Sequence, residues 1–291
     1  MVSIIIAAYN GAKFLDKFSL PSLGRQSFQD WEAIIVNDGS RDETKAVVEK
    51  WLVKDKRLRY IEHGTNRGLA AALNTGVANS RGEIIAFLEQ DDIWLKDKLA
   101  IQVEKLKAEN LLTTASYFAF NTKTGKIDDT GGGNFSTLIG RREIIEKLFP
   151  LPEDKKYLGI EDGILAARLE MLISQDGLSR EKIGTINEPL VIFSYNHPSL
   201  SGHQDTRLSR SRYRAVLDLF AAEKSSALND LKVFWRRHES QNRLAGLCPS
   251  SVQAGLRRLS AWRKKLENRH RFLATKKSPS YQEALEIIEK L

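Results

Sequence analysis

The stretch WEAIIVNDGSRDETKAVVEKWLVK (residues 31–54) contains the pattern that decides the fold. Its first seven residues are mostly apolar, as expected for a strand that is buried on both faces of a parallel sheet. A polar loop leads into residues 40–54, where Ser40 and Glu43 match a helix capping box. Helical spacing then aligns Ala46, Val47, Lys50, Trp51 and Val53 on one face. The stretch therefore predicts one buried strand, one polar loop and one amphipathic helix.

The same alternation extends to both sides of this unit. A further strand buried on both faces is predicted at 2–8, other strands at 57–63 and 83–89, and helices at 69–80 and 96–109. Residues 11–26 also have a helical pattern, which Pro21 bends or interrupts. Strands that alternate with helices predict an α/β fold whose parallel sheet is flanked by helices on both faces.

The pattern changes after residue 110. The segments TTASYFAF and KTGKIDD suggest antiparallel strands, and TGGGNFS (130–136) reads as a glycine-rich turn. Helices are predicted at 139–149 and 158–174, and a strand over 186–202 that runs into a loop. Beyond 203 the chain is predicted to be helical and basic, with turn signals near Cys248-Pro249 and Ser278-Pro279. We therefore divide the chain into a first domain, 1–202, and a C-terminal region, 203–291.

Charge is distributed unevenly along the 291 residues. The net charge is +8, but residues 1–200 carry −2 and residues 201–291 carry +10. Such asymmetry points to an anionic partner for the C-terminal region. No run approaches 18 apolar residues, the N-terminus lacks the pattern of a signal peptide, and Cys248 is the single cysteine. The expected location is the cytoplasm.

Polar side chains follow three of the predicted strands directly. They form the sequences Tyr9-Asn10-Gly11, Asn37-Asp38-Gly39-Ser40 and Glu89-Gln90-Asp91-Asp92. In open α/β sheets, ligands bind outside the carboxyl ends of the strands. We therefore expect these three groups to meet at one ligand-binding edge.

Glu89, Asp91 and Asp92 place three carboxylates within four residues. Because like charges repel, a folded chain must compensate them. Mg²⁺ or Mn²⁺ would do so, since these ions bind one or two carboxylates together with substrate phosphates. The alternative is a turn whose acids cap the helix that begins near Leu95.

Three further residues have both a functional and a structural interpretation. Asp38 could accept a hydrogen bond from a nucleobase or ribose, or could belong to an ordinary Asp-Gly turn. Asp162 lies at a helix start, where the ionised form that a general base requires is favoured, but it could also simply cap the helix. His197 could ligate a metal or touch a phosphate, or could be a surface loop histidine.

The assembled motifs resemble the inverting glycosyltransferases of family 2, which have the GT-A fold. The resemblance covers roughly residues 1–200. It rests on five segments in the family's order: SIIIAAYNGAKFL, WEAIIVNDGSRDET, NRGLAAALNTGVANSRGEIIAFLEQDDIWLKDKL, IEDGILAARL and INEPLVIFSYNHPSLSG. It implies a nucleotide-binding half at about 1–110 and an acceptor half at about 111–202. The EQDDIW version of the acidic motif is most similar to bacterial transferases that build cell-envelope polysaccharides.

The resemblance also implies roles for individual residues. Asp162 would be the catalytic base, with Glu161 beside it on the acceptor side. Asp91 would contact the Mn²⁺ or Mg²⁺ ion, and Glu89 would contact the ribose or a metal-bound water or ligate the ion itself. His197, singled out above for its imidazole, is the third candidate metal ligand. The nucleotide sugar, a UDP- or dTDP-sugar, would be held by Ala8, Tyr9, Asn10, Asp38, Arg67, Glu89, Gln90 and Asp91.

This sequence departs from the family pattern at three positions. Glu89 stands where the family commonly has Asp, and Asn37 replaces a frequent Asp. Leu73 replaces an Arg that often lies in the small-residue helix, so a phosphate contact there would have to come from Arg67.

The predicted function is metal-dependent, inverting transfer of a sugar to the hydroxyl of a saccharide or lipid-linked saccharide. The main alternative is a non-catalytic nucleotide-sugar or glycan-binding relative, and a nucleotidyltransferase is a third. Basic helices with interleaved aromatic residues in 203–275 fit either packing on the catalytic domain or contact with the anionic inner face of the plasma membrane. The sequence contains no recognised nucleic-acid-binding motif, so a nucleic-acid partner is not expected.

Overall fold

The computed structural model describes residues 1–107, 110–132, 134–154, 157–174, 177–197, 275–276 and 278–291. The predicted α/β architecture is confirmed. The first half contains strands β1 (Val2–Ala8), β2 (Trp31–Asn37), β3 (Leu58–Glu62) and β4 (Ile84–Phe87). Its helices are α1 (Ala12–Phe14), α2 (Leu20–Gly24), α3 (Thr44–Lys54), α4 (Leu69–Ala78) and α5 (Lys98–Lys107). A π-helical turn, η1 (Leu15–Ser19), joins α1 to α2, whose first turn contains Pro21. The helix therefore continues through Pro21, and its winding changes in the turn before the proline.

The predicted capping box of α3 is wrong. The helix begins at Thr44, and no side chain caps it from Glu43. Ser40 instead accepts a hydrogen bond from the backbone N–H of Asn10, and Asp42 accepts one from the N–H of Thr44. Val53, placed on the apolar face, is 75% exposed. The polar loop after β2 is longer than predicted because its side chains bind the neighbouring strand-end loop.

The second half contains β5 (Ile93–Trp94), β6 (Leu112–Asn121), β7 (Lys126–Gly132), β8 (Leu138–Arg141) and β9 (Ile183–Tyr195). Its helical elements are η2 (Phe135–Thr137), α6 (Arg142–Leu148), α7 (Glu161–Ser174), η4 (Arg180–Lys182) and α11 (Pro279–Ile288). Two predictions are corrected here. Residues 130–132 continue β7 rather than forming a turn, and residues 139–141 belong to β8 rather than to a helix.

The described residues form a nine-stranded sheet with the order β3-β2-β1-β4-β8-β6-β9-β5, and β7 pairs with β6. Strands β1 to β4 are parallel, whereas β8 pairs antiparallel with both β4 and β6. The chain runs outward from β1 through β2 to β3 and then returns to place β4 on the other side of β1. The carboxyl ends of β1 and β4 therefore flank a topological switch point, where doubly wound sheets bind ligands.

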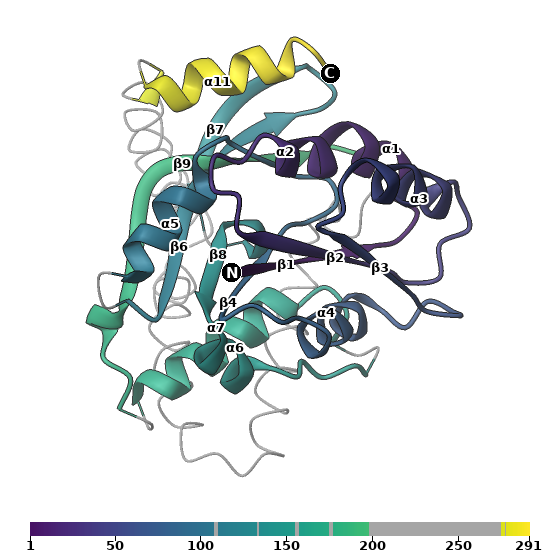
Figure 1. Cartoon of the computed structure of the whole chain (residues 1–291). Helices are drawn as coiled ribbons and strands as arrows, with labels where there is room; N and C mark the ends of the chain where they lie inside the picture. Colours follow the sequence, from purple (N-terminus) through teal and green to yellow (C-terminus); the bar gives the residue numbers. More distant parts are fainter. Residues whose placement is uncertain (108–109, 133, 155–156, 175–176, 198–274, 277) are drawn as a thin grey trace, which may run out of the picture.

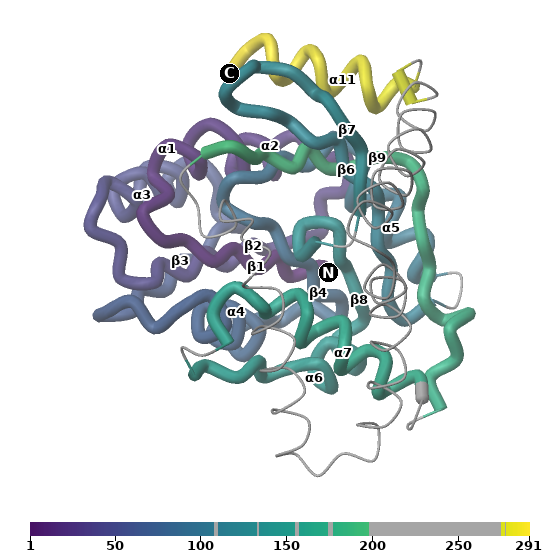
Figure 2. Tube along the Cα trace, turned by 180° about the vertical axis from the view of Figure 1, so that it is seen from behind, coloured from purple at the N-terminus to yellow at the C-terminus, as the bar shows by residue number. Residues whose placement is uncertain are grey.

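Helices cover both faces of this sheet (Figures 1 and 2). Ile4 and Ile6 of β1 pack with residues of α2, α3 and α5, whereas Ile5 faces a second cluster with α4, α6 and α7. This alternation follows from the strand period of two residues. Leu73, which replaces an Arg of the family pattern, packs in the second cluster and is 3% exposed. It therefore belongs to the core.

Helix α11 brings the end of the chain back to the sheet (Figure 1). Its Ala284 is fully buried in a third cluster, which includes Ile93 of β5, Phe118 of β6 and Ile192 of β9. The helix starts at Ser278, whose hydroxyl accepts from the N–H of Tyr281, and Pro279 occupies its first turn. The predicted turn signal at Ser278-Pro279 thus marks a helix start. Most of the predicted basic region, 203–274, lies outside the described residues.

Candidate functional site

The loops after β1 and β4 meet at the switch point through Gln90. Its Oε1 accepts the backbone N–H of Tyr9 at 3.0 Å, and its Nε2 donates to the Tyr9 carbonyl at 3.3 Å. A Cβ atom on Gly11 would lie only 2.0 Å from Gln90 Oε1. The absence of a side chain at Gly11 therefore allows the Gln90 amide to pair with the backbone, and 39% of Tyr9 is left exposed beside it.

The loops after β1 and β2 are joined in the same way. Asn10, which has a positive φ of 48°, donates its N–H to Ser40 Oγ and accepts the N–H of Arg41 at its Oδ1. Ala8, at the end of β1, is 1% exposed, and its carbonyl accepts the N–H of Asp38. The structure thus brings the three predicted strand-end groups to one edge of the sheet.

Asp38 organises the loop that follows β3. One carboxylate oxygen, Oδ1, lies 2.7 Å from His63 Nδ1 and accepts the N–H of Arg67, and Oδ2 accepts the N–H of Gly68. Asp38 is 3% exposed. The Arg67 guanidinium pairs with Glu153 at 2.9 Å. Both predicted nucleotide-binding residues therefore have protein partners, and His63 is a partner that the sequence analysis did not identify.

The acids after β4 lie against the η2 region and β9. Asp92 is fully buried, and its two oxygens accept from the N–H of Ser194 and from Asn134 Nδ2. Asn134 Nδ2 also lies 3.4 Å from Glu89 Oε2, and the Glu89 N–H donates to Ser136 Oγ. Ser194 Oγ donates to the Asp91 carbonyl. We refer to Glu89, Asp91 and Asp92 as the acid cluster.

Burial raises the pKa of every carboxyl in the acid cluster. The pKa of Glu89 lies well above its usual range, first because of burial and then because of the charges of Asp92, Asp91 and Asp162. Burial likewise raises the pKa of Asp92, with Asp91 adding to the effect. Burial also raises the pKa of Asp91, although the charge of His197 opposes this. A cation at this cluster would stabilise the ionised carboxylates, which burial disfavours most strongly.

Asp162 lies in the first turn of α7, on the opposite face of the sheet from α3 and α5. Its side chain is exposed, yet the surrounding protein removes enough hydration to raise its pKa to about 7, and the neighbouring charge of Glu161 adds to the shift. Glu161 itself is 4% exposed. Because Asp162 also acts on the pKa of Glu89, the predicted base and the acid cluster lie within electrostatic reach of each other.

His197 lies two residues beyond β9, directly beside the acid cluster. Its Nε2 is 3.3 Å from Asp91 Oδ2 and 3.0 Å from Ser194 Oγ. The ring contacts Phe14 with a centroid distance of 4.6 Å, and only 6% of the side chain is exposed. The interpretation of His197 as a surface loop histidine is therefore wrong.

The residues around Asp91 fit a divalent cation in part. A carboxylate oxygen and an imidazole nitrogen converge there, and two buried polar atoms nearby, Asn134 Oδ1 and His197 Nδ1, lack a hydrogen-bond partner. Within the described ranges, no three His, Cys, Asp or Glu side chains are grouped as a ready-made metal site. This matches ions such as Mg²⁺, which take one or two protein ligands and complete their shell with phosphates and water.

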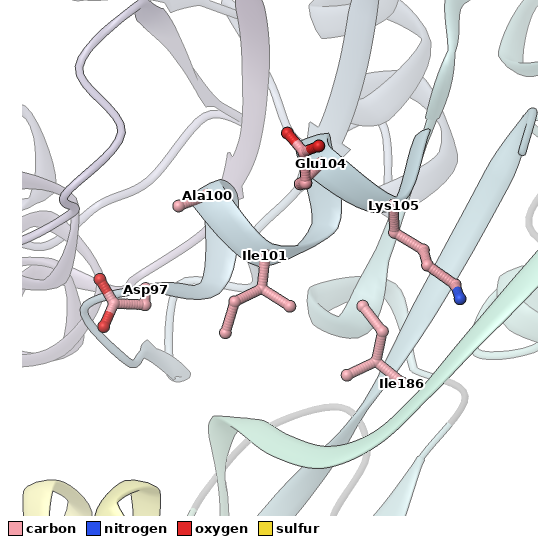
Figure 3. Close-up of a pocket in the computed structure, with 6 residues that line it drawn as sticks. All are labelled: Asp97, Ala100, Ile101, Glu104, Lys105 and Ile186. Atoms are coloured by element: carbon pink, nitrogen blue, oxygen red, sulfur yellow. The ribbon is translucent and has the colours of Figure 1, made fainter. Parts of the chain in front are cut away.

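A separate pocket of about 630 Å³ lies between α5 and β9 (Figure 3). Its lining includes Asp97, Ile101 and Glu104 of the α5 region and Ile186 of β9. No member of the acid cluster lines it. It is therefore not the site at the strand ends.

Asn134, Ser136 and Ser194 are functional neighbours that the sequence analysis missed. All three hold the acid cluster in place. Asn134 and Ser136 lay in a segment interpreted as a turn, and Ser194 lay inside a predicted strand. Such contacts between distant segments depend on strand pairing, which residue patterns do not specify.

The fold and the strand-end site together define a class: α/β proteins that bind a ligand at the switch point of a doubly wound sheet. The model of the glycosyl transferase family 2 matches residues 3–158. The chain belongs to this family and is a glycosyltransferase. In the part of the chain that the structure describes, no helix is both long enough and apolar enough to span a bilayer.

Several known proteins are similar to the chain. An uncharacterised glycosyltransferase of Haemophilus influenzae is 31% identical over 203 residues, which cover 64% of this chain and 81% of the relative. An Escherichia coli UDP-Glc:alpha-D-GlcNAc-diphosphoundecaprenol beta-1,3-glucosyltransferase is 33% identical over 111 residues, 36% of this chain and 43% of the relative. Other relatives are longer, and the chain spans only 19% to 22% of some of them.

A solved structure shares the fold. It is a mannosyltransferase from Pyrobaculum calidifontis in complex with GDP-Man and Mn²⁺, with a TM-score of 0.56 and 19% identity. The alignment covers 99% of this chain and 85% of the other. The chain therefore has the GT-A architecture that the sequence analysis predicted.

Proposed function

We propose that this glycosyltransferase moves a sugar from a nucleotide-diphosphate donor, a UDP- or dTDP-sugar, to a hydroxyl of a saccharide or lipid-linked saccharide, with inversion at the anomeric carbon. The observation that carries the proposal is that the loops after β1, β2 and β4 meet at one edge of the sheet, with His197 beside Asp91 of the acid cluster. We assign the acid cluster, whose carboxyl pKa values are raised, to the donor side and Asp162, whose pKa is about 7, to the acceptor side.

Asp162 is the proposed base. With a pKa of about 7, a large fraction is ionised at neutral pH, and the carboxylate still holds a proton well once it has taken one. It removes the proton from the acceptor hydroxyl as that oxygen bonds to the anomeric carbon. The bond between this carbon and the phosphate oxygen breaks, and the nucleoside diphosphate leaves with the electron pair. A single displacement of this kind inverts the configuration.

Asp91 and His197 would hold the divalent ion, with Glu89 close by. When bound, the ion would offset negative charge on the departing diphosphate. The mannosyltransferase that shares the fold was solved with GDP-Man and Mn²⁺, so a metal-bound donor is compatible with this architecture. Arg67 and the loop that Asp38 holds would lie on the nucleotide side.

The nucleotide is proposed to bind at the switch point. Tyr9 offers an exposed ring, on which a nucleobase can stack. Asp38 is buried, and it would serve the nucleotide by holding the loop at Arg67 and Gly68 in place. Ala8, Asn10 and Gln90 fix the backbone around Tyr9.

The proposed acceptor class rests on one relative. The Escherichia coli enzyme is named for a lipid-linked diphosphate acceptor. A comparable acceptor would bring this chain to the cytoplasmic membrane surface, and the basic residues in 203–274 suit anionic lipid there.

The test compares Asp162→Asn with Glu170→Gln, which changes an ion-paired glutamate of the same helix. Both variants should bind UDP in the presence of Mn²⁺. Asp162→Asn should lose sugar transfer by about 100-fold or more, as removal of a general base does, whereas Glu170→Gln should remain active. Transfer at the wild-type rate by Asp162→Asn would refute the base assignment.

A further inference from the structure

One face of the β7-β6-β9 sheet carries a row of aromatic side chains. From Tyr117 onward β6 and β9 pair in regular register, with Ala119 opposite Phe193 and Asn121 opposite Tyr195. Since alternate residues share a face, Tyr117, Phe193 and Tyr195 lie on the same side of the sheet. All three are half-buried. The opposite face, with Phe118, Phe120 and Ile192, is covered by α11.

The rings in this row contact each other and the edge strand. The centroids of Tyr117 and Phe193 are 5.0 Å apart with the planes tilted by 44°. A Cβ atom on Gly131, opposite Tyr117 on β7, would lie 2.4 Å from the Tyr117 hydroxyl. The tyrosine ring therefore lies over the glycine backbone, and a larger residue at 131 would displace it.

Acidic groups line the edge of the row. Tyr195 donates its hydroxyl to Asp128, and Asn121 Nδ2 lies 3.4 Å from the same carboxylate. Asp129, opposite Ala119, is on the aromatic side, and both aspartates are exposed. Half-buried rings beside exposed hydrogen-bond acceptors match the two faces of a sugar, which presents C–H groups to a ring and hydroxyls to carboxylates.

The row is continuous with the acid cluster. Ser194, the residue after Phe193, donates its N–H to Asp92. Burial raises the pKa of Tyr117, and Asp129, Asp92 and Glu89 raise it further, so its hydroxyl lies within reach of these charges.

We propose that Tyr117, Phe193 and Tyr195, with Asp128 and Asp129 along their edge, form the subsite that binds the acceptor saccharide next to the acid cluster. This inference rests on the proposed function and assigns its acceptor side. The sugar stacks on the rings of Tyr117 and Phe193, and its hydroxyls donate to the aspartates. The acceptor hydroxyl then points toward the acid cluster and the base.

The test observes the ring directly. The full chain is labelled with 3-fluorotyrosine, and the Tyr117 signal is assigned with Tyr117→Phe. Methyl glycosides of glucose, galactose, N-acetylglucosamine and rhamnose are titrated in the presence of UDP and Mn²⁺. At least one glycoside should shift the Tyr117 signal saturably. The Tyr60 signal is the internal control, because that hydroxyl bonds Asn37 at β2 and should not move.

Two variants sharpen the result. Phe193→Leu removes one ring of the pair. The affinity for the glycoside should fall by about tenfold, which is the upper range for an aromatic contact. Gly131→Ala should displace the Tyr117 ring and thereby weaken glycoside binding as well. The inference is overturned if UDP binds but no glycoside shifts Tyr117, or if both variants bind the glycoside as the wild type does. Failure of UDP to bind at all would instead count against the proposed function.

Discussion

His197 Nε2 lies 3.3 Å from Asp91 Oδ2, which joins the end of β9 to the loop after β4. The two side chains come from distant segments of the sequence, and both are largely buried. Since an imidazole and a carboxylate that converge can share a cation, this pair is the core of the proposed metal site.

The first prediction concerns this pair. His197→Ala and Asp91→Ala should each weaken Mn²⁺ binding in the presence of UDP by about tenfold or more, equivalent to about 1.4 kcal/mol. Calorimetric titration with Mn²⁺ measures the effect. Titration with UDP in a chelator is the control, because metal-free nucleotide binding should change little. Equal Mn²⁺ affinity in all three proteins would remove both residues from the metal site.

The second prediction is a pH dependence set by Asp162. Its pKa of about 7 means that kcat/KM should rise with pH, reach half its maximum near pH 7 and level off above it. The folded-state pKa lies above the ordinary value of 3.8. The folded protein therefore binds this proton more tightly, and the free energy of unfolding contributed by Asp162 falls as pH rises between these two values.

Thermal unfolding checks the same group independently of activity. Asp162→Asn cannot ionise, so its Tm at pH 8 should equal or exceed that of the wild type. A pH–rate profile that stays flat from pH 6 to pH 8 would contradict the assignment of about 7 to the catalytic base.

The third prediction concerns the contact of Gly11 with Gln90. In Gly11→Ala the new methyl group would collide with Gln90 Oε1 and displace the amide from Tyr9. Loss of such a hydrogen bond costs about 0.5–1.5 kcal/mol, so UDP binding with Mn²⁺ should weaken about two- to tenfold. Gly24→Ala is the matched control, since nothing lies within 4 Å of a Cβ there.

A double variant tests the mechanism of that loss. Gln90→Ala should weaken UDP binding as much as Gly11→Ala does. The double variant should bind UDP no more weakly than either single variant, because both substitutions remove the same contact between Gln90 and Tyr9. Additive losses would mean that Gly11 acts through something other than Gln90.

The sequence predicts the parallel half of the fold well, because continuous apolar runs signal β1, β2 and β4. Strand β2 was predicted with its observed ends, Trp31 and Asn37. Strand β8 was missed because its four residues adjoin a helix and carry no period of their own. The start of α3 was misplaced because Ser40, a strong capping residue, bonds Asn10 instead.

The location of the site at the strand ends could be predicted from the sequence. The residues that contact the acid cluster could not. Three polar motifs at the ends of β1, β2 and β4 specify the edge, since parallel strands end together. Which groups would surround the acid cluster depends on β8 and β9 packing beside β4 and β5. Asn134 and Ser194 reach the cluster only through that long-range pairing.

The fourth prediction concerns Lys98, a fully buried lysine at the start of α5. Its Nζ has no hydrogen-bond partner among the described residues and lies 3.7 Å from the ring centroid of Trp94. Burial lowers its pKa well below 10.5. The amine of Lys98 therefore binds a proton more readily in the unfolded chain than in the folded chain. As pH decreases below 10.5, the free energy of unfolding falls.

Replacement of Lys98 by an apolar side chain of similar length should remove the free-energy cost of burying its amine. Lys98→Met should raise Tm at pH 7 by about 2–4 °C for each kcal/mol gained. Lys107→Met, at an exposed position of the same helix, should leave Tm nearly unchanged. A lower Tm for Lys98→Met would mean that the ammonium contact with Trp94 stabilises the fold.

The fifth prediction concerns the attachment of α11 to the segment that follows the acid cluster. Glu283 Oε1 accepts the backbone N–H of Lys96 at 2.7 Å, and Ile93 and Leu95 pack in the cluster that α11 covers. Glu283→Ala should leave the Lys96 amide without this partner and accelerate its hydrogen exchange. Glu283→Gln keeps a carbonyl oxygen at the same distance along the side chain and should preserve protection, whereas Glu286→Ala changes an exposed residue of α11 and should have no effect. Equal exchange at Lys96 in Glu283→Ala and the wild type would mean that α11 packs on the sheet without restraining this segment.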